Sequence, residues 1–160
     1  MAKISILMGS QSDLETVSET VNVLKEFKAD FEVRVLSAHR TPKEVVQYVE
    51  AAPKGGTKVF IAAAGMSAAL AGVVAAHTTL PVIGIPIETK NLKGLDSLLS
   101  TVQMPPGVPV ACMAIGKSGA RNAAILALEI LGLNDPKITA KLINYKKQMC
   151  LKIKQAKIKV

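Results

Sequence analysis

The stretch that decides the fold of this chain is Val59-Phe60-Ile61-Ala62-Ala63. Five consecutive apolar residues, some of them β-branched or aromatic, are typical of a strand that is buried on both faces. Such strands belong to parallel sheets with helices packed on both sides. The stretch continues into Ala64-Gly65, where the glycine predicts the end of the strand and a turn.

The same alternation of strand and helix patterns extends along the chain. Strands are predicted at 3–8, 31–36, 57–63, 81–85 and 109–115. Helices are predicted at 12–28, 42–52, 67–79, 92–101 and 118–132, with a last helix from about 137 that Asn134 or Asp135 caps and Pro136 opens. This order predicts an α/β fold: a three-layer α/β/α sandwich around a single, doubly wound parallel sheet of flavodoxin- or Rossmann-like type, with an extra C-terminal helix.

The composition indicates one compact unit. With 160 residues, 49% of them hydrophobic, we expect a single domain over 1–160 with its core in 1–136. No apolar run approaches the roughly 18 residues of a membrane span, and the first residues lead straight into a strand pattern rather than a signal peptide. Cys112 and Cys150 do not make a disulfide framework, so we expect a reducing, cytoplasmic location and no membrane partner.

The net charge of +8 comes from one segment of the chain. Residues 137–160 hold eight lysines and no acid, whereas the rest of the chain carries equal numbers of basic and acidic side chains. Because the apolar residues of this segment partly follow helical spacing, we interpret it as a basic helix with a solvated lysine face. A nucleotide- or RNA-binding role is a distant alternative, since no aromatic platform or zinc motif accompanies the lysines, and no nucleic acid is expected.

A group of reactive side chains follows the second predicted strand, in the loop Ser37-Ala38-His39-Arg40-Thr41-Pro42. In an open α/β sheet, ligands bind at the carboxyl ends of the strands. His39 can exchange a proton near neutral pH, and the planar fork of Arg40 can hold a phosphate or carboxylate. This pairing predicts proton transfer on an anionic small molecule.

Two further loops fall at the same edge. In Met8-Gly9-Ser10-Gln11-Ser12-Asp13, Gly9 permits a sharp turn, the serines and the following helix can bind an anion, and Asp13 can accept hydrogen bonds from ribose hydroxyls. The alternative for this loop is a capping box formed by Ser12 and Glu15. The small residues between Ala62 and Gly72 permit close approach of a planar ligand, and tight helix or subunit packing is their alternative explanation.

The remaining reactive residues have ordinary interpretations. His77 is expected to be structural or solvated, and Cys112 to be a small core residue. Two histidines and no carboxylate cluster do not make a metal site, so no metal is expected. The loop after the first strand is neither a Walker nor a GxGxxG motif, and no cofactor is expected. The stretch from Gly84-Ile85-Pro86 through Leu98-Leu99 is expected at the far rim of the pocket or at a neighbouring subunit.

Four motifs together resemble the N5-carboxyaminoimidazole ribonucleotide mutase family of purine biosynthesis. They are MGSQSD, SAHRTP, GLDSLLSTVQMPPGVPV and AIGKSGARNAAILALEIL, and the likeness covers roughly residues 3–132. The resemblance implies an isomerase that moves a carboxylate, as CO2, from the exocyclic nitrogen to ring carbon 4 of the ribonucleotide. It also implies a homo-octamer in which the C-terminal helix packs across subunits.

The resemblance also implies roles for individual residues. His39 is the general acid/base, Arg40 and Ser37 bind the phosphate, and Ser10 and Asp13 bind the ribose-phosphate part. The other substrate-binding residues that we expect are Gly9, Ser12, Ala64, Gly65, Ser67, Ala69 and Leu70.

The third loop departs from the usual mutase pattern. Mutases of this family usually carry a second histidine and a proline where this chain has Ala69 and Ala71. Related lyases that carboxylate aminoimidazole ribonucleotide directly with CO2 show a similar serine–leucine pattern here. Those lyases typically have lysine where this chain has Arg40, so the mutase is the favoured interpretation and the direct carboxylase is the alternative.

Overall fold

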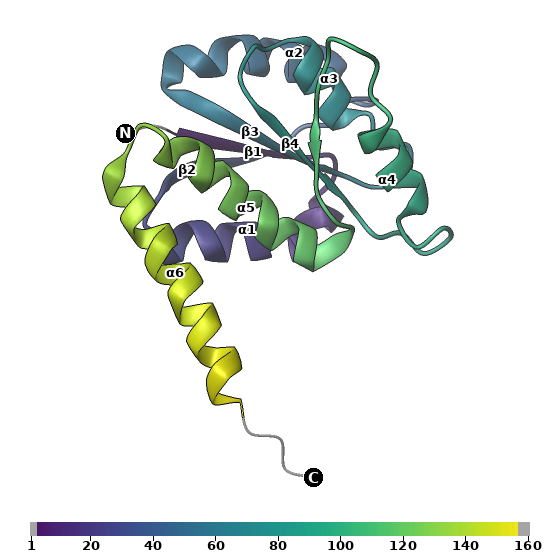
Figure 1. Cartoon of the computed structure of the whole chain (residues 1–160). Coiled ribbons are helices and arrows are strands. Elements are labelled where there is room, and N and C mark those ends of the chain that lie inside the picture. The colour runs from purple at the N-terminus through teal and green to yellow at the C-terminus, as the bar shows by residue number, and fades with distance from the viewer. Residues whose placement is uncertain (1–2, 157–160) are drawn as a thin grey trace.

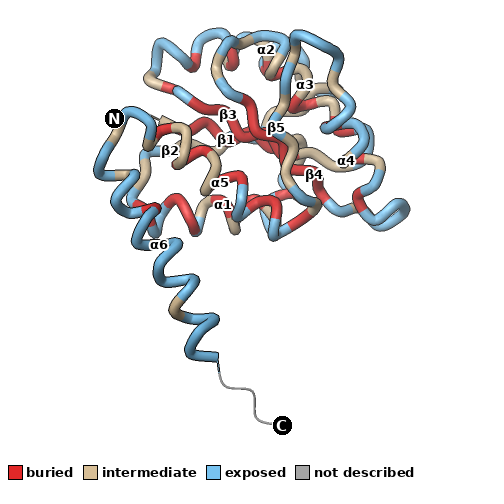
Figure 2. The backbone as a smooth tube through the Cα atoms, in the orientation of Figure 1, coloured by how far each residue is buried: buried red, intermediate tan, exposed pale blue. Residues whose placement is uncertain are grey.

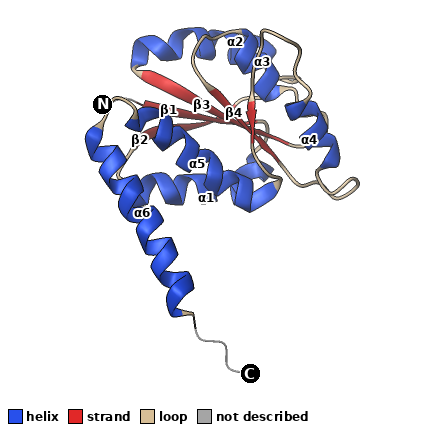
Figure 3. Cartoon of the chain, viewed as in Figure 1, coloured by secondary structure: helices blue, strands red, loops and turns tan. Residues whose placement is uncertain are grey.

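A five-stranded parallel sheet forms the centre of the structure, which is a computed structural model and describes residues 3–156 (Figure 1). The strands are β1 (Lys3–Met8), β2 (Asp30–Val35), β3 (Thr57–Ala64), β4 (Val82–Pro86) and β5 (Ala111–Cys112). The helices are α1 (Leu14–Glu26), α2 (Pro42–Ala51), α3 (Leu70–Ala76), α4 (Leu95–Val102), α5 (Gly116–Gly132) and α6 (Pro136–Gln155), with 3-10 turns at Gln11–Asp13 and Ala52–Gly55. Helices lie on both sides of the sheet, which confirms the predicted three-layer sandwich (Figure 3).

The two faces of the sheet bury two separate apolar clusters. Helices α1 and α5 pack on one face together with Ile61, and α2 and α3 pack on the other together with Phe60. Both of these β3 residues are fully buried, as expected for the central strand of a doubly covered sheet. Figure 2 shows the buried course of β3 between the helices. The apolar stretch that predicted the fold is therefore the strand that joins the two cores.

The strand order is β2-β1-β3-β4-β5, and every pair is parallel. The chain leaves β1 toward one edge of the sheet, then returns to the other side of β1 to form β3. This reversal places a crevice between the loops that follow β1 and β3, the position where ligands bind in folds of this order. In register, Met8 at the end of β1 lies opposite Ala63, so both loops start at the same level.

The predicted helix over 67–79 is wrong at both ends, because α3 covers only Leu70–Ala76. Residues 65–69 form a loop in which Met66 has a positive φ of 59°, a conformation that no α-helix contains. The predicted helix over 92–101 likewise begins later, at Leu95, because Gly94 has φ 87°.

The predicted strand over 109–115 is reduced to the two residues of β5. Pro109 cannot donate a ladder hydrogen bond, and β5 is an edge strand that pairs with β4 alone. Cys112 is consequently only half-buried at this edge, so its prediction as a core residue is wrong. Partial burial raises the pKa of its thiol.

Helix α6 extends away from the sandwich (Figure 1). Asp135 caps it by accepting a hydrogen bond from the Lys137 amide at 2.9 Å, and Pro136 occupies its first turn, as predicted. The predicted basic segment 137–160 corresponds to α6 as far as Gln155, and residues 157–160 lie outside the described part. None of the helices within residues 3–156 has the length and apolarity needed to cross a bilayer.

A polar network holds β1, β2 and α2 together on one face of the sheet. The Tyr48 hydroxyl donates to Glu32 at 2.6 Å, and the Lys3 ammonium lies 2.9 Å from the same carboxylate. Partial burial of Glu32 raises its pKa, but the hydrogen bonds from Tyr48 and Lys3 and the charges of Lys3 and Arg34 outweigh burial and lower the pKa to about 2.

Replacing Glu32 with glutamine is expected to lower the free energy of unfolding at neutral pH by about 1–2 kcal/mol, after allowance for screening of this partly exposed group. A lowered pKa stabilises the fold at pH values above the unfolded pKa of about 4.5 and loses that contribution as the pH falls toward about 2. Urea unfolding of Glu32→Gln and wild type between pH 7 and pH 3 should therefore converge at acid pH. The exposed-acid control Asp30→Asn should show no such convergence, and parallel curves for Glu32→Gln would contradict the assignment.

Candidate active site

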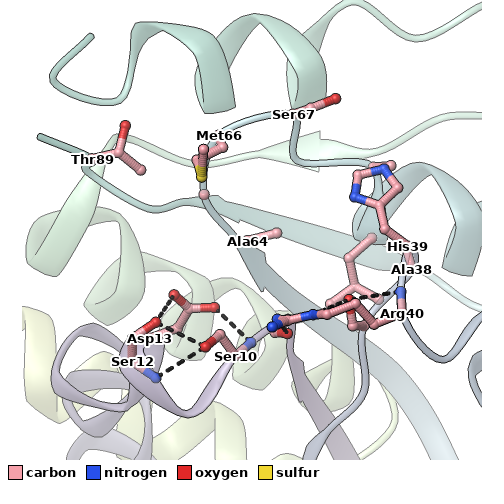
Figure 4. A pocket seen from close by; sticks show the side chains of 15 residues that line it. Ser10, Ser12, Asp13, Ala38, His39, Arg40, Ala64, Met66, Ser67 and Thr89 are labelled. Carbon is pink, nitrogen blue, oxygen red and sulfur yellow. Dashed lines mark hydrogen bonds between the residues drawn. The ribbon is translucent and has the colours of Figure 1, made fainter. Parts of the chain in front are cut away.

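One cavity of about 540 Å³ opens at the carboxyl edge of the sheet, at the crevice between β1 and β3 (Figure 4). All the residues that we predicted for the site line this cavity. They come from the loops after β1 (Gly9, Ser10, Ser12, Asp13), β2 (Ser37, His39, Arg40) and β3 (Ala64, Gly65, Ser67, Ala69), and from Leu70 at the start of α3.

The loop after β1 is ordered by its own polar groups. Ser10 accepts a hydrogen bond from the Ser12 amide at 3.3 Å, and Asp13 accepts one from the Ser10 amide at 3.0 Å. The capping box therefore joins Ser10 to Asp13, and the expected pair of Ser12 with Glu15 is wrong. The reason is that a 3-10 turn at Gln11–Asp13 precedes α1, which moves the cap two residues toward the N-terminus.

Asp13 is a buried residue whose carboxyl group lines the cavity. Burial raises its pKa, against the lowering effect of the Ser10 amide, the Ser12 hydroxyl and the Arg40 charge. A raised pKa means that the ionised form is favoured less in the folded chain than in the unfolded one, so keeping Asp13 charged at neutral pH costs folding free energy. Groups held at such a cost in a cleft are candidates for ligand binding.

Arg40 connects two of the three loops. Its guanidinium donates to the Gly9 carbonyl oxygen at 2.8 Å through one terminal nitrogen and to the Ser37 hydroxyl at 3.3 Å through Nε. These bonds draw the charge toward the serine loop after β1, and they leave the other terminal nitrogen for a ligand. A positive charge beside serine hydroxyls is suited to a phosphate.

His39 is exposed and lines the cavity. In Figure 4 the imidazole lies on the Ser67 side of the cavity, and the Arg40 guanidinium lies on the Ser10 side. The loop that carries both residues is fixed by Thr41, whose hydroxyl accepts from the Ser37 amide at 2.9 Å and donates to the Ser37 carbonyl oxygen at 3.1 Å. The site thus brings a guanidinium and an imidazole together in one cavity.

Three lining residues were not among the predicted site residues: Ala38, Met66 and Thr89. Thr89 follows β4, so the rule that strand carboxyl ends converge could have identified it. Its hydroxyl lies 3.4 Å from both carboxylate oxygens of Asp96. The rest of the stretch from Gly84 to Leu99 does not line the cavity, which places only Thr89 at the predicted far rim. No sequence signal marks Met66, because its left-handed backbone is set by tertiary contacts.

The other histidine stays outside the site. His77 ends α3 and lies 3.3 Å from Glu50, with a partly exposed side chain, which confirms its expected structural or solvated role. Within residues 3–156, no three His, Cys, Asp or Glu side chains gather as a metal ion would require.

Comparison with known proteins decides the family of the chain. The family described as AIR carboxylase matches residues 3–152, nearly the whole length. The chain belongs to the AIR carboxylase family. All the residues that line the cavity, from Gly9 to Thr89, fall within the part of the chain that matches the AIR carboxylase family.

Individual relatives agree with this membership. The chain is 55% identical to the N5-carboxyaminoimidazole ribonucleotide mutase of Methanocaldococcus jannaschii, over 94% of this chain and 92% of that protein. It is 53% identical to the mutase of the same name from Pyrococcus abyssi, over 93% of this chain and 84% of that protein. The crystal structure of Treponema denticola PurE superposes with a TM-score of 0.87 at 30% identity, over 96% of this chain and 94% of that one.

Proposed function

We propose that this AIR carboxylase family member is an N5-carboxyaminoimidazole ribonucleotide mutase. The observation that carries the proposal is the meeting of His39 and Arg40 with Ser10 and Asp13 in one cavity of about 540 Å³. A single ribonucleotide, with one ring, one ribose and one phosphate, falls within the range of ligands that such a volume holds. Relatives that carry this name cover more than nine-tenths of the chain, which supports the same substrate.

The reaction is an isomerisation in two balanced steps. A proton from His39 goes to the exocyclic nitrogen, the bond between this nitrogen and the carboxylate carbon breaks with its electron pair left on nitrogen, and CO2 is released. Ring carbon 4 then attacks the CO2 carbon, and the proton that it loses returns to His39. No atom or electron is gained from outside, and the enclosed pocket keeps the CO2 close to the ring.

The binding residues divide by chemistry. Arg40 and Ser37 take the phosphate, and Ser10, Ser12 and Asp13 hold the ribose-phosphate part. The walls of the cavity are formed by Gly9, Ala64, Gly65, Ser67, Ala69 and Leu70. Apart from Leu70, these residues are small, so they leave room for the flat ring. The bond between Arg40 and the Gly9 carbonyl oxygen supports this division, because it aligns the guanidinium with the serine loop before any ligand binds.

Replacing Arg40 with methionine is expected to raise the KM for the ribonucleotide about 10- to 100-fold, because one or two charge-assisted hydrogen bonds to the phosphate are lost. Arg40→Lys should give an intermediate KM, since lysine keeps the charge without the planar fork. Arg121, which pairs with Glu19 outside the cavity, provides the matched control Arg121→Met. Steady-state kinetics in which Arg40→Met and Arg121→Met behave alike would contradict the phosphate assignment.

Direct carboxylation of aminoimidazole ribonucleotide by CO2 is the second candidate. One observation favours it: Ala69 lines the cavity with a methyl group. At this position, mutases of the family that the chain resembles usually carry a histidine. The test compares the initial rate on the N-carboxylated ribonucleotide with the rate on aminoimidazole ribonucleotide plus bicarbonate. The mutase proposal expects the first to be faster, and a clear preference for the second pair would replace the mutase with the lyase.

We also propose that the chain works as a homo-oligomer, and the resemblance implies eight copies. The support is apolar surface on two helices: Leu95, Leu99 and Val102 of α4, and Ile143 and Ile153 of α6, all of them about half exposed or more. Light scattering on the purified chain tests the assembly. A monomeric mass at micromolar concentration would overturn it.

A further inference from the structure

Met66 has an unusual backbone in the wall of the cavity. Its φ is 59°, a left-handed value that side chains beyond glycine and asparagine rarely adopt. Residues on both sides of Met66, Gly65 and Ala68, are held by packing. A Cβ on Gly65 would lie 2.9 Å from the Thr89 methyl group, so the backbone there packs closely against Thr89, and Ala68 is almost completely buried. The loop is therefore anchored at both ends and strained in the middle.

The strain presents an apolar side chain to solvent. Met66 is 65% exposed, although it lies only two residues after the buried strand β3 and lines the cavity. Figure 4 shows it between Thr89 and Ser67, across the cavity from Ser10, Ser12 and Asp13. Local strain of this kind persists where the surrounding structure imposes it, and it collects at ligand clamps and active sites.

We propose that the Met66 side chain closes over the bound ribonucleotide and keeps released CO2 in the cavity. The inference rests on the proposed function. The anion-binding end fixes the phosphate on the opposite side, so the heterocycle extends toward the wall that carries Met66 and His39. A thioether on an unbranched chain with three rotatable bonds can adapt to a flat ring and exclude water from it.

The chemistry of the intermediate explains why this residue is apolar. CO2 carries no charge and offers only weak hydrogen-bond acceptors, so polar groups do not hold it. It stays beside the ring only if its route to solvent is blocked for longer than carbon 4 needs to capture it. Met66 is thus a specificity-determining residue: it favours transfer of the substrate's own carboxylate over exchange with dissolved CO2.

The test follows the carboxylate carbon. The N-carboxylated ribonucleotide, labelled with carbon-13 in the carboxylate, is converted in unlabelled bicarbonate buffer with carbonic anhydrase present to trap escaped CO2. Mass spectrometry of the product at matched conversion then gives the ratio of retained to lost label. Met66→Ala is expected to lower this ratio roughly tenfold, the factor that corresponds to one buried aliphatic side chain. Met66→Leu and the remote, 83% exposed control Leu133→Ala should match wild type.

A second measurement addresses the backbone. Met66→Gly removes both the side chain and the left-handed strain, so it should lose label as Met66→Ala does and also have the higher Tm of the two. Equal label retention in wild type and Met66→Ala, at any turnover rate, overturns the inference while leaving the mutase intact. Failure of the wild type to form C-carboxylated product from this substrate overturns the proposed function, and the inference with it.

Discussion

His39→Asn is expected to lower kcat roughly 10²- to 10⁴-fold while the protein stays folded. Asparagine is close to histidine in reach and polarity, but it neither gives nor takes a proton at neutral pH. Both proposed steps need that proton, first at the exocyclic nitrogen and then from carbon 4. Because His39 is exposed and lies in a loop held by Ser37 and Thr41, its removal leaves the core unchanged. Initial rates on the N-carboxylated ribonucleotide, with circular dichroism as the folding check, measure the effect.

The chain supplies its own control in its second histidine. His77→Asn changes the same functional group outside the cavity, where the ring contacts Glu50. It should leave kcat within about twofold of wild type, the range of surface substitutions away from special features. If His39→Asn kept more than a tenth of the wild-type rate, the role of His39 as the proton carrier would be refuted.

Gly119→Ala is expected to destabilise the fold by about 3 kcal/mol or more. Gly119 lies in the first turn of α5, and a Cβ there would overlap the carbonyl oxygen of Ala114. This atom belongs to the backbone of the preceding loop, which cannot move aside as the end of a flexible side chain can. Alanine gains about 1 kcal/mol of helix propensity over glycine, which does not offset the overlap.

Denaturant unfolding of Gly119→Ala measures this effect, with Gly55→Ala as the matched control. A Cβ on Gly55 would meet nothing within 4 Å, so that variant should stay within about 0.5 kcal/mol of wild type. Equal midpoints for the two variants would show that the start of α5 can shift to make room. Since α5 packs on both α1 and the sheet, such a shift would also alter the larger core cluster.

The order of the elements and the loops of the site were predictable because both depend on local patterns. Doubly buried strands are continuous apolar runs, and β3 is one. Parallel strands all end at one edge of the sheet, so the loops that start at Gly9, Ser37 and Ala64 had to converge. That convergence is a property of the topology, which explains why predicted residues that are far apart in the sequence line one cavity.

The boundaries of two helices, α1 and α3, and one wall of the site were not predictable from local patterns. The stretch 67–69 holds two alanines, which are good helix formers, yet it remains a loop. The packing of Gly65 against Thr89 and the burial of Ala68 and Leu70 fix its path. The capping box moved from Ser12 to Ser10 for a related reason: a 3-10 turn, which propensity does not indicate, lies before α1. Tertiary contacts overrode local preference in both places.

The sequence by itself determined a doubly covered parallel sheet, the reactive loop Ser37–Pro42 at its edge, and the kind of ligand that Arg40 and His39 suit, because these follow from side-chain chemistry and from periodicity. Only the tertiary structure decided that Arg40 reaches across to the Gly9 carbonyl oxygen, that Thr89 closes the far side, and that Met66 stands exposed on a left-handed backbone. Those features depend on distances between segments that are distant in the sequence, and such distances are fixed only when the whole sheet packs.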